Sequence, residues 1–148
     1  MANSAMALNR VSTTRGVIMK GSCLCGKCKF EIEGDPGQIN KCYCTKCRKV
    51  SGTGSNAVLW IEPDNLKWIG SEDYVKTHEM GDGWQSVFCR ECGSPLPRLI
   101  SGEEWIVPAG VLDVGVETVV RAHIYVENKP AWEVIGDDAP QYQDVPSE

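Results

Sequence analysis

Short stretches in which apolar and polar residues alternate run along most of the chain. Alternation with a period of two predicts half-buried β-strands, because successive side chains of a strand point to opposite faces. Turn residues separate most of the stretches at the spacing of about 8 to 12 residues that is typical of an all-β domain. The expected strands are residues 16–23, 28–34, 55–61, 66–69, 74–78, 84–88, 96–100, 105–109 and 121–126.

Only one short segment carries the signals of a helix. Thr45 is a suitable N-cap, residues 46–50 continue the helix, and Gly52 ends it. The first two strands are expected to pair as a hairpin, because Gly34 and Pro36 end the second one. The pattern therefore predicts a mainly β protein with one short helix.

Five tryptophans occur, at positions 60, 68, 84, 105 and 132. Large aromatic side chains on alternating strands usually fill the core, so we expect core packing here, with a binding surface as the alternative.

The length of 148 residues fits a single domain, which we assign to residues 17–148. Residues 1–16 are interpreted as a disordered N-terminal extension. Their lack of acidic residues, together with Arg10 and Arg15, would also suit a transit peptide.

Charge and hydropathy exclude some classes of function. The formal net charge of −5 argues against binding to nucleic acid. No run of apolar residues is long enough to span a membrane, and residues 1–10 lack the continuous apolar core of a secretory signal. We therefore expect a cytoplasmic protein. The sequence leaves the oligomeric state open.

Eight cysteines gather in three clusters: 23, 25 and 28; 42, 44 and 47; 89 and 92. Paired cysteines in a reducing compartment mostly bind metal, and four thiolates that converge tetrahedrally close a structural zinc site. Disulfides would suit the even count but not a chain without a secretory signal. The spacings also lack the runs that ferredoxins use for iron–sulfur clusters.

The clusters differ in what they can supply. Cys89 and Cys92, followed by Gly93, have the form of a zinc-knuckle turn that needs a second pair of ligands. The triple at 42, 44 and 47 can fill three corners by itself, which leaves a fourth position open, as in reactive zinc sites. Cys28 is expected to be a buried thiol packed as a hydrophobe, with metal binding as the alternative. Spacing alone does not decide which pairs share an ion.

The chain resembles the glutathione-dependent formaldehyde-activating enzyme family, which includes centromere-protein-V-like proteins. The resemblance covers about residues 17–142. It rests on residues 21–26, 42–48 with Ser51 and Gly52, 88–96, and the closing segments 110–113, 123–132 and 137–142.

The resemblance implies a zinc-binding β-tent fold, similar to that of Rab exchange factors, with two zinc ions per chain. Cys23, Cys25, Cys89 and Cys92 would hold a structural ion, and Cys42, Cys44 and Cys47 the open one. The implied activity is that of a carbon–sulfur lyase, S-(hydroxymethyl)glutathione synthase, which adds formaldehyde to glutathione. Another small thiol or aldehyde is an open variant of this reaction. The alternative is a zinc-stabilised protein-interaction module without catalysis.

Few other side chains are candidates for chemistry. Lys46, Arg48 and Lys49 lie beside the open triple and could attract an anionic thiol, or could simply solvate a turn. His123 could act as a base, but a single histidine on an apolar strand is more often structural. Asp137 and Asp138 are interpreted as a charged turn.

Overall fold

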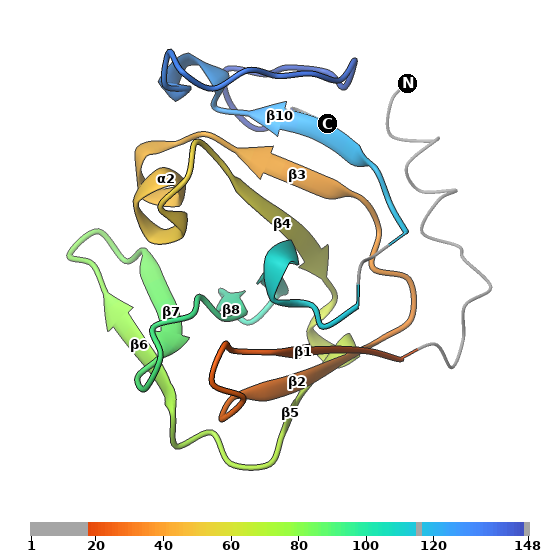
Figure 1. Ribbon diagram of the computed structural model, residues 1–148, viewed down its shortest axis with the longest axis vertical. Coiled ribbons are helices and arrows are strands. Elements are labelled where there is room, and N and C mark those ends of the chain that lie inside the picture. Colours follow the sequence, from red (N-terminus) through yellow and green to blue (C-terminus); the bar gives the residue numbers. More distant parts are fainter. Residues whose placement is uncertain (1–17, 115–116, 147–148) are drawn as a thin grey trace.

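A computed structural model describes residues 18–114 and 117–146 of the chain (Figure 1). The predicted extension, residues 1–16, and the domain boundary at residue 17 lie outside the described residues. Among the described residues no helix is both long and apolar enough to cross a membrane.

The protein is mainly β, as the alternation of apolar and polar residues predicts. The described residues form ten strands in three sheets of three, five and two strands. The strands are β1 (Ile18–Ser22), β2 (Lys29–Glu33), β3 (Ile39–Cys42), β4 (Asn56–Ile61), β5 (Leu66–Ile69), β6 (Val75–Glu79), β7 (Gln85–Cys89), β8 (Arg98–Ile100), β9 (Glu104–Pro108) and β10 (Val120–Ile124). Three short 3₁₀ turns, Pro63–Asn65, Ala109–Val111 and Val126–Asn128, accompany them.

The first sheet has the order β1-β2-β5, and the predicted hairpin of β1 and β2 is confirmed. The five-stranded sheet has the order β10-β3-β4-β9-β8. Within it β3 and β10 are parallel, although the chain separates them by more than 70 residues. β3 is not among the strands that the pattern predicts. β6 and β7 form a separate antiparallel hairpin.

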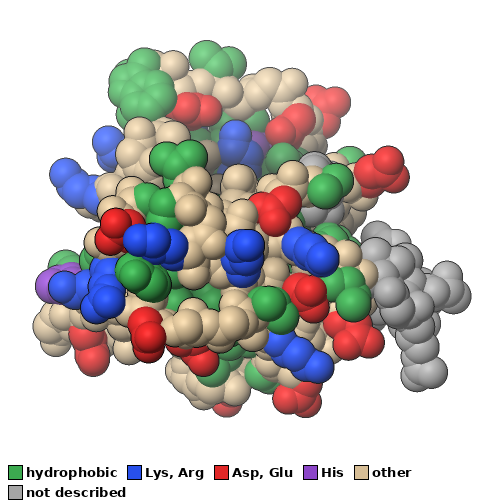
Figure 2. All heavy atoms as spheres, turned by 60° about the horizontal axis from the view of Figure 1, so that its bottom comes forward, with side chains coloured by type: hydrophobic (Ala, Val, Ile, Leu, Met, Phe, Trp, Pro, Cys, Tyr) green, Lys and Arg blue, Asp and Glu red, His purple; other side chains and the backbone are tan. Residues whose placement is uncertain are grey.

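The largest apolar cluster lies between the three-stranded and five-stranded sheets, as their facing positions in Figure 1 show. Phe30 and Ile32 of β2 pack there with Leu59 and Ile61 of β4. These residues alternate along their strands with more exposed ones, so each sheet buries one face. On the face seen in Figure 2, basic and acidic side chains are interspersed.

The α-helix of the described residues, α2 (Thr45–Ser51), ends at Gly52 as predicted, but its N-cap is Cys44 and not Thr45. The sulfur of Cys44 accepts a hydrogen bond from the backbone N–H of Cys47 at 3.4 Å. The N-cap therefore lies one residue earlier than predicted, because the thiol of Cys44 accepts the capping hydrogen bond that a hydroxyl group usually accepts.

The tryptophans divide between three environments. Trp68 and Trp105 pack against the main core with their rings edge to face, 6.2 Å apart, as expected. Trp60 and Trp84 instead line a cavity. Trp132 is 68% exposed, so the expectation of core packing is wrong for this residue.

Candidate metal centres and their cavity

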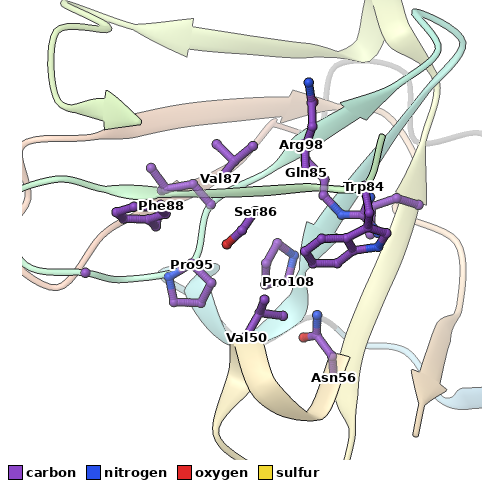
Figure 3. Close-up of a pocket in the computed structure, with 13 residues that line it drawn as sticks. Val50, Asn56, Trp84, Gln85, Ser86, Val87, Phe88, Pro95, Arg98 and Pro108 are labelled. Atoms are coloured by element: carbon purple, nitrogen blue, oxygen red, sulfur yellow. The ribbon is translucent and has the colours of Figure 1, made fainter. Parts of the chain in front are cut away.

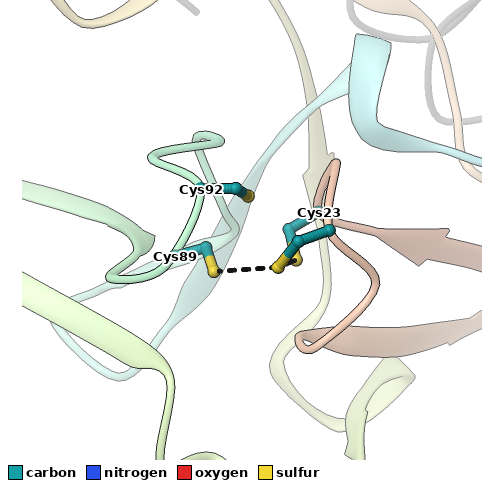
Figure 4. Close-up of side chains that lie close together, drawn as sticks. Cys23, Cys89 and Cys92 are labelled. Carbon is teal, nitrogen blue, oxygen red and sulfur yellow. Dashed lines mark hydrogen bonds between the residues drawn. The ribbon is translucent and has the colours of Figure 1, made fainter.

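The first candidate centre joins two loops that are far apart in sequence. Cys23 and Cys25 lie in the loop between β1 and β2, and Cys89 and Cys92 lie at the end of β7 and in the following turn. Their four sulfur atoms all lie within 4.8 Å of one another. Figure 4 shows Cys89 and Cys92 facing Cys23 across a short gap.

The sulfur spacing fits a tetrahedral zinc ion. Four sulfurs bound at the zinc–sulfur distance are about 3.8 Å apart. The Cys23 and Cys25 sulfurs are 3.5 Å apart, and those of Cys25 and Cys89 are 3.8 Å apart. The Ser94 hydroxyl, 3.3 Å from the Cys92 sulfur, lowers the pKa of Cys92 to about 5 by hydrogen bonding to the thiolate. The group therefore suits a closed, structural zinc site.

Further contacts hold these two loops together. Lys27 forms an ion pair with Glu91 at 3.3 Å, and the backbone N–H of Leu24 donates to the Ser94 hydroxyl at 2.8 Å. The cysteines at 23 and 25 lie in a loop and not on a strand. The turn of this loop therefore brings their two sulfurs together.

Cys28 is fully buried beside this group but is not among its four sulfurs. Burial raises the pKa of the Cys28 thiol to about 12, so the side chain is neutral at physiological pH. It packs in a cluster with Cys23, Cys89 and Leu96. This environment is what the interpretation of Cys28 as a small apolar side chain requires.

The second candidate centre is the triple Cys42, Cys44 and Cys47, whose sulfur atoms also lie within 4.8 Å of one another. Cys42 ends β3, Cys44 caps α2, and Cys47 is buried in the first turn of that helix. Hydrogen bonds from the thiols of Cys42 and Cys47 lower the pKa of Cys44 to about 2, and the same contact with Cys44 raises the pKa of Cys42 to about 11. The three neighbouring sulfurs thus favour ionisation of Cys44, which suits a group that could bind a cation.

The triple opens into a cavity of about 630 Å³. This volume lies within the range typical of small-molecule sites. Its walls are largely apolar and include Trp60, Ile106 and Ile124. The four-cysteine group does not line this cavity, so only the triple combines an incomplete ligand set with room for a ligand.

A smaller hollow of about 200 Å³ adjoins the cavity (Figure 3). The two share Trp84, Arg98 and Ile106, but no cysteine lines the smaller one. Its floor includes Val50 and Pro108. The larger cavity is therefore the candidate site for chemistry, and the smaller hollow is a side chamber separated from it by shared side chains.

The three predicted cations lie at different places. Lys46 lines the cavity, and its ammonium group forms a short ion pair with Asp82 and lies 5.8 Å from the ring centre of Trp84. Arg48 donates to the carbonyl oxygen of Asn128 at 3.2 Å. Lys49 is exposed and is not among the residues that line the cavity.

A fourth cation, Arg98, lines the cavity and was not found from the sequence. It begins β8, and its guanidinium carbon lies 4.6 Å from the ring centre of Trp84. The segment around it has the composition of an ordinary strand. Only the position of β8 at the edge of the five-stranded sheet brings Arg98 to the triple.

His123 is buried and has a partner on each ring nitrogen. The Tyr43 hydroxyl lies 2.8 Å from Nδ1, and a carboxylate oxygen of Asp137 lies 2.8 Å from Nε2. Hydrogen bonding to His123 lowers the pKa of Asp137. His123 is not among the residues that line the cavity, which supports the structural interpretation of this residue. Asp137 was expected in a charged turn, and its hydrogen bond to His123 also connects the C-terminal segment to β10.

Comparisons with known proteins identify the family of the chain. Residues 18–128 match the family model of the glutathione-dependent formaldehyde-activating enzymes. A protein of Halomonas elongata, whose name provisionally describes it as such an enzyme, is 34% identical over 128 residues, which are 78% of this chain and 80% of the relative. A crystal structure of a Rhodobacter sphaeroides protein shares the fold, with a TM-score of 0.56 and 22% identity over 69% of this chain and 99% of that chain. Because the family match extends from β1 to beyond β10, the protein belongs to the glutathione-dependent formaldehyde-activating enzyme family.

Proposed function

We propose that the protein is a zinc-dependent carbon–sulfur lyase of the S-(hydroxymethyl)glutathione synthase type, which adds formaldehyde to glutathione. The observation that supports this proposal most strongly is that the three-cysteine group opens into a cavity of about 630 Å³. Family membership and the modest identity to the Halomonas elongata relative support the same class of reaction.

The donor set of the triple fits zinc, since three thiolates satisfy three of its four tetrahedral positions. When bound there, zinc would ionise a thiol and polarise a carbonyl at the remaining position. Cys42, Cys44 and Cys47 would hold the ion at the end of the cavity. Cys23, Cys25, Cys89 and Cys92 would hold a second ion with a structural role.

The remaining wall residues would position the substrates. Apolar side chains such as Trp60 and Ile124 exclude water from the reacting atoms, and Lys46 and Arg98 supply positive charge. The reaction joins the thiol sulfur to the carbonyl carbon, and the proton lost by the thiol ends on the former carbonyl oxygen. No oxidant or reductant is needed. Holding both reactants together can lower the barrier by several kcal/mol, roughly, through proximity alone.

The test must separate catalysis from the spontaneous reaction of formaldehyde with glutathione. We expect NMR exchange measurements at equilibrium to show faster interconversion of free glutathione and its adduct with wild-type protein than with no protein. Cys47→Ser should lose this acceleration, because it removes one ligand of the open site. Equal exchange rates without protein, with wild type and with the variant would contradict the proposal and favour the protein-interaction module.

A further inference from the structure

Arg98 lines the cavity, and the proposed reaction gives it no specific partner. Its side chain is half-buried in the wall that the main cavity shares with the side chamber. The ion pairs of residues 18–114 and 117–146 join Lys27 to Glu91, Lys46 to Asp82 and His123 to Asp137. Within the same residues the guanidinium therefore has no carboxylate partner.

The aromatic ring of Trp84 fixes the position of this guanidinium. The 4.6 Å separation of the guanidinium carbon and the ring centre is typical of a cation–π contact. Trp84 lies next to Lys46 as well, and Lys46 is already paired with Asp82. Glu127, which lines the same cavity, is exposed and does not pair with Arg98. Among the described residues, Arg98 thus lines the cavity with five N–H donors and no ion pair to a carboxylate.

The cysteine triple acts on Arg98 as a source of negative charge. Burial lowers the pKa of Arg98, and the charges of Cys47, Cys44 and Cys42 oppose that effect. Arginine nonetheless stays protonated in proteins. A fixed cation and an incomplete metal-ligand set therefore share one cavity, so a ligand could reach both at once.

From this geometry we infer that the cavity takes a thiol that also carries a carboxylate, and that Arg98 binds the carboxylate while the thiol lies at the triple. A planar guanidinium matches a carboxylate through two parallel hydrogen bonds, whereas a lysine ammonium acts as a point charge. Glutathione carries two carboxylates and one thiol. The inference rests on the proposed function and adds to it the group that selects acidic thiols over neutral ones.

A different role for Arg98 is to offset the negative charge of the thiolates. In that role Arg98 would affect metal retention and would influence all thiols alike. Carboxylate binding instead predicts an effect that depends on the thiol. The experiment therefore compares a thiol that carries free carboxylates with thiols that carry none.

Calorimetric titration of the zinc-loaded protein with glutathione, glutathione diethyl ester and 2-mercaptoethanol tests the inference. We expect wild type to bind glutathione about ten-fold to a hundred-fold more tightly than the diester, the range for hydrogen bonds to a charged group. Arg98→Gln should lose most of this preference while binding 2-mercaptoethanol as wild type does. Arg98→Lys should keep only part of it. Zinc content is measured in each preparation.

Lys49→Gln is the matched control, because it removes one positive charge from the exposed face of α2. An equal loss of preference in Lys49→Gln and Arg98→Gln would show diffuse attraction and overturn the inference. An unchanged preference in Arg98→Gln would overturn it as well. If Arg98→Gln no longer holds zinc, Arg98→Lys decides instead, and a preference equal to that of wild type in this variant would overturn the inference. If thiols bind but substitution of Arg98 does not change the preference for glutathione over its diester, only the inference fails and the proposed function stands. If no thiol binds to wild type, the inference and the proposed function both fail.

Discussion

Gly21 shows how a single residue can be fixed by the side chain opposite it. In the hairpin of β1 and β2, Gly21 pairs with Phe30, and the aromatic ring lies over the glycine. A Cβ added at Gly21 would lie 2.1 Å from the Phe30 ring carbon Cζ, and Phe30 is 1% exposed. The ring therefore has little room to move without disturbing the main core.

Gly21→Ala is expected to lower the free energy of unfolding by about 1–3 kcal/mol, the usual cost of overpacking a core. Thermal denaturation of the zinc-loaded protein measures the effect. Gly110→Ala is the control, because an added Cβ there meets nothing within 4 Å and the backbone does not have a positive φ. Equal melting temperatures for the two variants would contradict the packing argument.

At the scale of elements, the hairpin of β6 and β7 links the two candidate centres. Its C-terminal end supplies Cys89 to the four-cysteine group, and its turn side supplies Trp84 to the wall of the cavity. Asp82 in the same turn pairs with Lys46 of α2. Because the first sheet contacts this hairpin through the cysteine loops, closing the structural centre also positions the wall of the reactive one.

Cys89→Ser is therefore expected to abolish the cooperative fold, since a structural zinc site contributes on the order of 10 kcal/mol, comparable to the stability of a whole domain. Cys47→Ser should instead keep the fold and weaken metal binding only at the triple. Circular dichroism melts together with zinc content measure both. A Cys89→Ser protein with native melting temperature, or a Cys47→Ser protein that unfolds as severely, would show that the roles of the two centres are misassigned.

On the scale of the whole molecule, the two cysteine groups are separate: one joins the three-stranded sheet to the hairpin, and the other lies where β3 meets α2. Each group has its own set of sulfurs, so neither needs the other to be complete.

Elemental analysis of protein isolated under reducing conditions is expected to give two zinc ions per chain. Brief treatment with a chelator should remove the ion of the triple first, because that site opens into the cavity and has one ligand fewer. A single tightly held ion, or iron in place of zinc, would contradict this partition.

The sequence by itself determined the elements whose pattern is local. Alternating residues located nine of the ten strands that the described residues form, and Gly52 located the end of the helix. The pattern did not predict β3, because this strand is short and includes the buried polar residue Asn40. Its pairing with β10 also depends on a segment that is distant in the chain. The cysteine spacing also revealed three clusters, because metal ligands must come from close turns.

Tertiary structure alone decided which clusters share a centre and which cation faces it. Cys23 and Cys89 meet only because two separate β-hairpins pack together, and no spacing rule encodes a contact over 66 residues. The family resemblance implied that pairing, whereas nothing local indicated Arg98. Arg98 lines the same cavity as the triple because β8 pairs with β9 at the sheet edge, and Trp84 from another hairpin contacts its guanidinium. Sequence patterns record which face of an element is apolar, and the packing of whole elements determines what that face meets.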